Sequence, residues 1–222
     1  MKKNEIVSNV NEFIEKSLQH KGEYIVEVMG RPIRIHPQVL SPRYSYSSRF
    51  IIENWDVGAD MTVLDVGTGS GILALFAALQ GAKRVVALDI NIHACAIAEK
   101  NMRENRVFRK VTVVHSDLYT GLPKERFDRV VFNAPYWNKK TDPALPLTYG
   151  VYDEDYSVLN RFLKESGEYL ALGGKILLGF SSQGDVARVR QMINSAGWNI
   201  EKEIREKKGH TRILFYLKDN GT

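Results

Sequence analysis

Residues 64–72 read Leu-Asp-Val-Gly-Thr-Gly-Ser-Gly-Ile, and this stretch decides the fold of the 222-residue chain. The apolar residues 61–66 before the glycines have the length of a buried strand, and the apolar residues 71–80 after them have the length of a helix. Gly67, Gly69 and Gly71 allow the backbone to turn sharply and to approach a ligand without intervening side chains. A glycine-rich connection from a buried strand into a helix indicates a doubly wound α/β sheet.

Strand and helix patterns continue to alternate beyond the glycines. Further strands are predicted at residues 84–90, 111–117, 127–133 and 174–180, and helices at residues 93–105, 156–170 and 185–197. Because parallel strands are joined by crossover helices, the pattern predicts a mostly parallel, seven-stranded sheet with helices on both faces. Residues 198–218 form two extended stretches around Lys208-Gly209 with no helix between them, so we expect the last strand to be antiparallel.

A different pattern precedes the first glycine-linked strand. Apolar residues recur at helical spacing over residues 5–18, and residues 24–35 alternate around Gly30 as in a β-hairpin. We therefore expect two regions: an N-terminal helix and hairpin over residues 1–40, and an α/β domain over residues 41–222.

Composition limits the class of protein. Hydrophobic residues make up 44% of the chain and charged residues 26%, which is typical of a globular domain. No apolar run reaches the length of about 20 residues that spans a bilayer, and the N-terminus lacks the apolar segment of a signal peptide, so we expect a soluble cytoplasmic protein with no membrane contact. The single cysteine excludes an internal disulfide, and the five scattered histidines give no reason to expect a metal. The net charge of +5 favours an acidic partner only weakly.

Two nucleotide-like ligands compete for the glycine-rich turn. Residues 69–74 match the G-x-G-x-x-A form of the dinucleotide fingerprint, with Asp89 about 20 residues beyond. Asp65, however, places a carboxylate immediately before the glycines, where it would repel a pyrophosphate. The same carboxylate suits the cationic amino acid end of S-adenosylmethionine, reached directly or through water. We therefore expect S-adenosylmethionine as the cofactor, with S-adenosylhomocysteine as its product.

Polar residues at the ends of the next strands complete the expected cofactor site. Asp89 can accept hydrogen bonds from both ribose hydroxyls. Ser116 and Asp117 are placed to meet the adenine amino group, with Ile90 and Leu118 as apolar neighbours of the ring. The alternative is that the glycines make only a tight turn and the aspartates cap helices. The predicted cofactor-binding residues are Asp65, Gly67, Thr68, Gly69, Gly71, Asp89, Ile90, Ser116, Asp117, Leu118 and Asn133.

The strand at residues 127–133 ends in Asn-Ala-Pro-Tyr, a sequence that ordinary turn chemistry does not favour. A planar NH2 group is a poor nucleophile that no ordinary side chain can deprotonate beforehand. The Asn133 side-chain carbonyl and the Ala134 backbone carbonyl can each accept one of its N–H bonds and stabilise the positive charge that forms. Pro135 would stiffen the turn, and Tyr136 would offer a flat face to the target. The alternative is a buried aromatic corner in which Asn133 bonds its own backbone.

The segments Asp-Val-Gly-Thr-Gly-Ser-Gly, Ala-Leu-Asp-Ile and Phe-Asn-Ala-Pro-Tyr-Trp together resemble the class I S-adenosylmethionine-dependent methyltransferases that modify planar nitrogens. The resemblance covers about residues 41–217 and is strongest to the N5-glutamine methyltransferases of peptide chain release factors. It implies a methyltransferase domain over residues 41–222 and catalytic roles for Asn133, Ala134, Pro135 and Tyr136. Ala134 departs from the family's motif, which has proline at this position, but it keeps the backbone carbonyl.

The substrate stays open between three classes. Protein glutamine, possibly on a release factor, is the first expectation, and a base of RNA or DNA, or a small molecule, is the alternative. A module that binds a nucleotide cofactor without catalysis is the non-enzymatic alternative, which the presence of Asn133 disfavours. The candidate substrate contacts are Arg43, Trp137, Lys139 and Lys140.

Overall fold

A computed structural model describes residues 10–219 of the chain, so residues 5–9 of the predicted first helix lie outside the described residues. The helices are α1 (Val10–Leu18), α2 (Ser47–Asn54), α3 (Ile72–Leu79), α4 (Ile92–Glu104), α5 (Ser157–Glu165) and α6 (Val186–Ser195), with short 3-10 helices at η1 (Pro146–Gly150), η2 (Glu154–Tyr156) and η3 (Ser166–Tyr169). The strands are β1 (Tyr24–Val28), β2 (Arg31–Ile35), β3 (Thr62–Val66), β4 (Arg84–Asp89), β5 (Val111–His115), β6 (Phe127–Asn133), β7 (Leu170–Ser181), β8 (Trp198–Lys208) and β9 (His210–Asp219).

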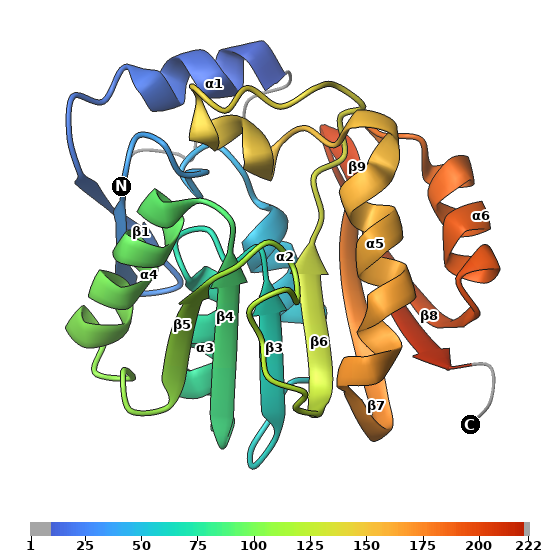
Figure 1. The fold of residues 1–222 in the computed structure, drawn as a ribbon. Helices are drawn as coiled ribbons and strands as arrows, with labels where there is room; N and C mark the ends of the chain where they lie inside the picture. The colour runs from blue at the N-terminus through green and yellow to red at the C-terminus, as the bar shows by residue number, and fades with distance from the viewer. Residues whose placement is uncertain (1–9, 220–222) are drawn as a thin grey trace.

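Seven strands form one sheet in the order β5-β4-β3-β6-β7-β9-β8 (Figure 1). The first five are parallel to one another, and β9 pairs antiparallel with both β7 and β8. The predicted fold class is therefore confirmed, including the antiparallel last strand.

The chain runs outward from β3 to β5 and then returns to β6 on the other side of β3, so the strand order reverses between β3 and β6. In doubly wound sheets, ligands bind at the carboxyl ends of the strands beside such a reversal.

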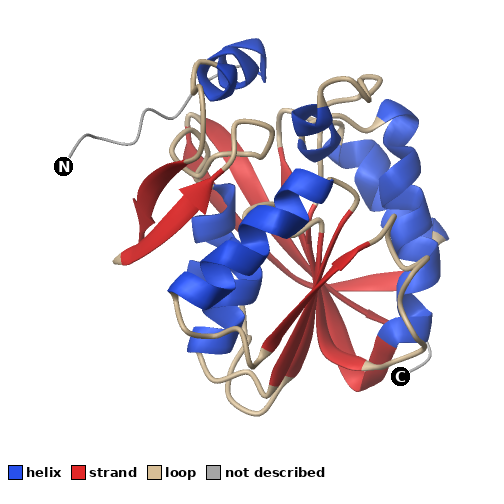
Figure 2. Cartoon of the chain, turned by 60° about the vertical axis from the view of Figure 1, so that its left-hand side comes forward, coloured by secondary structure: helices blue, strands red, loops and turns tan. Residues whose placement is uncertain are grey.

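Helices cover both faces of the twisted sheet, as Figure 2 shows. Alternate residues of each strand point to opposite faces, so Val63 packs in one apolar cluster with α2 and α3, whereas Leu64 packs in a second cluster with α5 and α6. The inner parallel strands β3, β4 and β6 are thus buried on both sides, which explains their nearly continuous apolar sequences.

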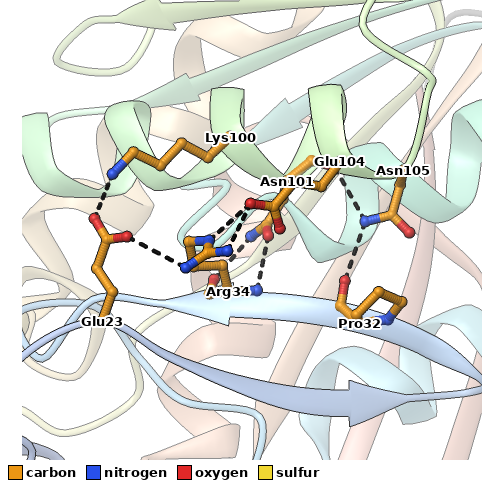
Figure 3. Close-up of polar contacts among 7 residues, drawn as sticks. All are labelled: Glu23, Pro32, Arg34, Lys100, Asn101, Glu104 and Asn105. Atoms are coloured by element: carbon orange, nitrogen blue, oxygen red, sulfur yellow. Dashed lines mark hydrogen bonds and ion pairs between the residues drawn. The ribbon is translucent and has the colours of Figure 1, made fainter.

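The predicted hairpin is confirmed as β1 and β2, and it lies against α4 (Figure 3). Asn101, which is fully buried on α4, accepts a hydrogen bond from the backbone N–H of Arg34 (2.7 Å) and donates to the carbonyl of Arg34 (2.8 Å). The same amide donates to the carbonyl of Ser70 in the glycine-rich turn (2.8 Å). Asn101 therefore joins the hairpin and the turn to one helix.

The predicted helix at residues 156–170 is divided in the structure. The α-helix α5 ends at Glu165, and the 3-10 helix η3 follows. The Ser166 hydroxyl donates to the carbonyl of Phe162 (2.5 Å), and the Trp198 indole donates to the carbonyl of Leu163 (2.7 Å), so side chains satisfy carbonyls of the last turn. No helix within residues 10–219 is long and apolar enough to span a membrane.

Candidate active site

The glycine-rich turn connects β3 to α3 at the point where the strand order reverses. Gly67, Gly69 and Gly71 have φ values of 65°, 57° and 81°, in the left-handed region that favours glycine. A Cβ at Gly71 would lie 2.7 Å from the Met102 side chain and 3.1 Å from Ala98, both on α4. The turn thus needs glycine for its backbone conformation, and at Gly71 also for close packing on a helix.

Asp65 stabilises this turn through hydrogen bonds. Its side chain is fully buried, and one carboxylate oxygen accepts hydrogen bonds from the Thr68 hydroxyl (2.6 Å) and from the Ala74 N–H (3.0 Å). Burial raises the pKa of Asp65 to about 7. The residue therefore binds the two ends of the turn and does not line the adjacent cavity, while its second carboxylate oxygen has no hydrogen-bond partner within the described residues. The contact with the cofactor, direct or through water, stays a prediction.

Asp89 closes β4 and reaches the turn from the side. Its two oxygens accept hydrogen bonds from the N–H groups of Gly69 and Asn91, both at 2.8 Å. Burial raises the pKa of Asp89 to about 6. Unlike Asp65, this carboxylate lines the cavity, where its remaining lone pairs can accept hydrogen bonds from a ligand.

A cavity of about 310 Å³ lies at the carboxyl ends of the strands. Most of the predicted cofactor residues line it, together with Pro135 of the catalytic motif. These cofactor residues are Gly67, Thr68, Gly69, Asp89, Ile90, Ser116, Asp117, Leu118 and Asn133. Gly71 is absent from the lining, because it faces α4 instead.

The residues predicted to meet an adenine amino group make further contacts of their own. The Ser116 hydroxyl donates to the carbonyl of Leu118 (2.8 Å), so it shapes the loop. Both carboxylate oxygens of Asp117 lie within 3.2 Å of Nη1 of Arg161, which also lines the cavity from α5. Arg161 could not be predicted as a site residue, because it lies on a predicted helix remote in sequence from the strand ends.

Two loops, at residues 38–42 and 146–152, form a further part of the cavity wall. Residues 38–42 contribute Gln38, whose buried Oε1 has no hydrogen-bond partner within the described residues. Residues 146–152 contribute Tyr149 and Tyr152, while α1 packs above the same loop through Phe13 (Figure 1). Loops of this kind carry no periodic signal, so only the folded structure brings them to the site.

The Asn-Ala-Pro-Tyr motif separates the large cavity from a small second one of about 40 Å³. Asn133 lines both cavities, Pro135 lines the first, and Ala134 and Tyr136 line the second. The Ala134 N–H donates to the carbonyl of Gly179 on β7 (3.1 Å), which fixes the turn. Within residues 10–219 no hydrogen bond engages the Asn133 carboxamide or the Ala134 carbonyl, so both oxygens stay available as acceptors.

The aromatic residues of the motif form one edge of the second cavity. The Tyr136 and Trp137 ring centroids lie 4.3 Å apart, and the Tyr136 ring makes an edge contact with Phe180. Burial raises the pKa of Tyr136 to about 12, so its hydroxyl is neutral at physiological pH. Tyr136 thus presents an uncharged surface beside Asn133.

The remaining candidate substrate contacts lie farther out. Lys139 and Lys140 are exposed beyond the motif, and the Lys139 ammonium lies 5.6 Å from the centre of the Tyr152 ring. Arg43 packs over Tyr24 and lines neither cavity. The structure therefore brings Trp137 to the site, places the two lysines at its periphery and separates Arg43 from it.

Comparison with known proteins agrees with this geometry. A family model described as "Methyltransferase small domain" matches residues 32–203. The chain is 28% identical over 187 residues to a Methanocaldococcus jannaschii protein with the provisional name protein N5-glutamine methyltransferase, covering 82% of this chain and 92% of the relative. It is 30% identical over 202 residues to the release factor glutamine methyltransferase of Rhodopirellula baltica, covering 82% of this chain and 67% of the relative.

Among solved structures, a methyltransferase from Pyrococcus furiosus superimposes with a TM-score of 0.67 at 23% identity, over 86% of this chain and 91% of that chain. This likeness shows that the two proteins share a fold. The match of the family model over most of the chain shows more: the chain belongs to the methyltransferase small domain family, and it is an S-adenosylmethionine-dependent methyltransferase.

Proposed function

We propose that this methyltransferase acts on the side-chain amide of glutamine in a protein. The observation that carries the proposal is the position of Asn133, which forms part of the wall of both cavities. A cofactor in the large cavity and a planar amide in the small one would meet at this residue. The names of the two relatives favour glutamine as the target.

The large cavity fits S-adenosylmethionine. A Cβ at Gly69 would meet no atom closer than 4.0 Å, so the turn leaves open space beside its backbone. In this proposal Asp89 binds the ribose hydroxyls, and Ile90, Asp117 and Leu118 surround the adenine. The bound cofactor supplies an electrophilic methyl group on a sulfonium. The buried acceptor of Gln38 is a further contact that the sequence did not indicate.

The motif supplies the chemistry that an amide requires. An amide nitrogen has a delocalised lone pair, so it needs to be oriented and polarised before it can attack a methyl group. The Asn133 side-chain oxygen and the Ala134 backbone oxygen would each accept one N–H bond, which directs the lone pair toward the large cavity. The same two oxygens stabilise the positive charge that develops on nitrogen. Neutral Tyr136 would provide the flat apolar surface that a planar amide contacts.

A nucleic acid base is the second candidate, because its amino group is also planar. The observation in its favour is the exposed pair Lys139 and Lys140 just beyond the motif. Arg161, which lines the large cavity, is already paired with Asp117 (3.0 Å). Two exposed lysines can contact an acidic protein surface equally well, so they do not outweigh the relatives that are named for glutamine.

A transfer assay tests the proposal. Purified protein is incubated with radiolabelled S-adenosylmethionine and with host extract divided into protein, nucleic acid and small-molecule fractions. We expect label in protein that maps to glutamine. Label confined to nucleic acid or to small molecules would reject glutamine as the target and leave the methyltransferase assignment intact.

A further inference from the structure

The second cavity has a charged wall opposite the motif. Arg212, near the start of β9, lines this cavity together with Asn133, Ala134 and Tyr136. Its side chain is only 1% exposed. The Nη1 atom donates to the carbonyl of Lys208 (3.2 Å), but Nε and Nη2 have no hydrogen-bond partner within residues 10–219. One edge of a buried guanidinium is therefore left unsatisfied beside the catalytic motif.

Another buried arginine of the same protein shows which kind of group the Nε–Nη2 edge of a guanidinium can bind. Arg129, which is 9% exposed, donates from Nε and Nη2 to the two carboxylate oxygens of Asp56, both at 2.8 Å. Arg212 has no hydrogen bond to a carboxylate within the described residues. Glu206 lies opposite it in the β8–β9 pairing and interacts with it electrostatically, but Oε1 of Glu206 pairs with Lys208 (3.0 Å) and its buried Oε2 has no hydrogen-bond partner. Leaving buried donors unpaired costs about 1 to 3 kcal/mol, and more for charged groups.

Of the basic side chains around the Tyr46 ring, Arg212 lines the second cavity, whereas Lys208 (4.0 Å from the ring centre) and Arg49 (5.4 Å) do not. The Arg212 guanidinium lies 5.2 Å from the centre of the Tyr46 ring, a contact that supports the cation but accepts no hydrogen bond in the plane of the guanidinium. His210 also lines the cavity, and burial together with Arg212 lowers the pKa of its imidazole. A neutral His210 adds no second charge, so a ligand would meet a single cationic edge.

We propose that the Nε–Nη2 edge of Arg212 binds the carbonyl oxygen of the target carboxamide. This inference rests on the proposed function. If Asn133 and Ala134 take both N–H bonds of the amide, the carbonyl oxygen is its one remaining polar atom, and two lone pairs on that oxygen match two donors. The positive charge would also repel a lysine ammonium. Arg212 is thus a specificity-determining residue for an uncharged amide.

The test compares Arg212→Met and Arg212→Lys with a matched control, Arg129→Met, using a peptide chain release factor as the substrate. We expect both Arg212 variants to lose at least tenfold in kcat/KM for glutamine methylation, with S-adenosylmethionine affinity changed less than twofold. Lysine keeps the charge but lacks the planar pair of donors, so it should not restore activity.

Thermal unfolding of the cofactor-free protein separates substrate binding from a structural role. Arg212→Met removes an unsatisfied buried charge, so its Tm should equal or exceed that of the wild type. Arg129→Met leaves Asp56 without its partner, so its Tm should fall while kcat/KM stays unchanged.

The outcomes for the two proposals are distinct. If the wild type methylates glutamine and folded Arg212→Met matches its kcat/KM, the Arg212 inference is wrong and the proposed function stands. Full activity of Arg212→Lys would likewise reject the role of the planar edge. Failure of both Arg212 variants to fold would assign the residue a structural role. A wild-type protein that labels no glutamine would instead reject the proposed function.

Discussion

At the scale of single residues, the two carboxylates at neighbouring strand ends have different tasks. Asp65 and Asp89 each end an apolar strand, so the sequence predicts both in the cofactor site. The structure puts Asp89 on the cavity wall and Asp65 beneath the turn. The difference lies in where each side chain points once the turn has formed, which the sequence alone does not reveal.

Replacing Asp89 with alanine should weaken S-adenosylmethionine binding at least tenfold. The change removes the acceptor for ribose hydroxyls and leaves the N–H of Gly69 without its partner, and a hydrogen bond to a charged group contributes about 1.5 to 3 kcal/mol. Isothermal titration calorimetry measures the Kd, with Glu99→Ala on the exposed side of α4 as the control. An unchanged Kd would remove Asp89 from the site.

Replacing Asn133 with alanine should lower kcat at least a hundredfold while the cofactor Kd changes little. The variant loses one of two acceptors that act on developing charge, and losing one such preorganised group typically costs about 10² to 10³ in rate. Single-turnover methylation with saturating cofactor measures the effect. Full turnover in a folded variant would contradict the polarisation of nitrogen by this residue.

At the scale of elements, the regular periodicities predicted the sheet well. Each strand predicted between residues 61 and 180 lies at nearly its expected position, because buried parallel strands need continuous apolar sequence. The cavity wall contributed by residues 38–42 could not be predicted, and for Tyr149 and Tyr152 the sequence left open whether they line the cavity or pack a lid. These segments have no repeating pattern, and their approach to the site depends on α1, the hairpin and α4 packing in place.

The hairpin and α4 give a prediction at this scale. Asn101→Ala removes the partner of one N–H and two carbonyls that belong to Arg34 and Ser70, so the free energy of unfolding should fall by about 2 to 3 kcal/mol. Urea denaturation followed by circular dichroism measures the change. Glu104→Gln weakens an ion pair with Arg34 at the surface and should cost less than about 1 kcal/mol. Equal losses in the two variants would argue against the buried amide as the main connection.

At the scale of the whole molecule, every part of the proposed site lies at one end of the sheet, and α1 lies above the same end (Figure 1). The boundary at residue 40 between an N-terminal region and the methyltransferase domain stays a prediction. The hairpin residues Ile33 and Ile35 are fully buried in the same apolar cluster as α3, and the family model begins at residue 32. We propose that the hairpin folds together with the domain and that α1, through Phe13, forms the roof of the substrate cavity.

Burial of Asp65 beneath the turn makes the stability of the whole molecule depend on pH. Its pKa is raised to about 7 in the folded protein, well above the ordinary value of 3.8, so the folded state holds a proton that the unfolded state has released between these values. This stabilising contribution is complete below pH 3.8 and is lost as the pH rises through 7. Asp65→Asn stays neutral throughout. The free energy of unfolding of the wild type minus that of the variant should therefore fall between pH 4.5 and 7.5. Urea titrations of the pair measure this difference, to which Asp89 also contributes, because its charge raises the pKa of Asp65. A difference that is constant across this range would show that the Asp65 carboxylate is ionised in the fold.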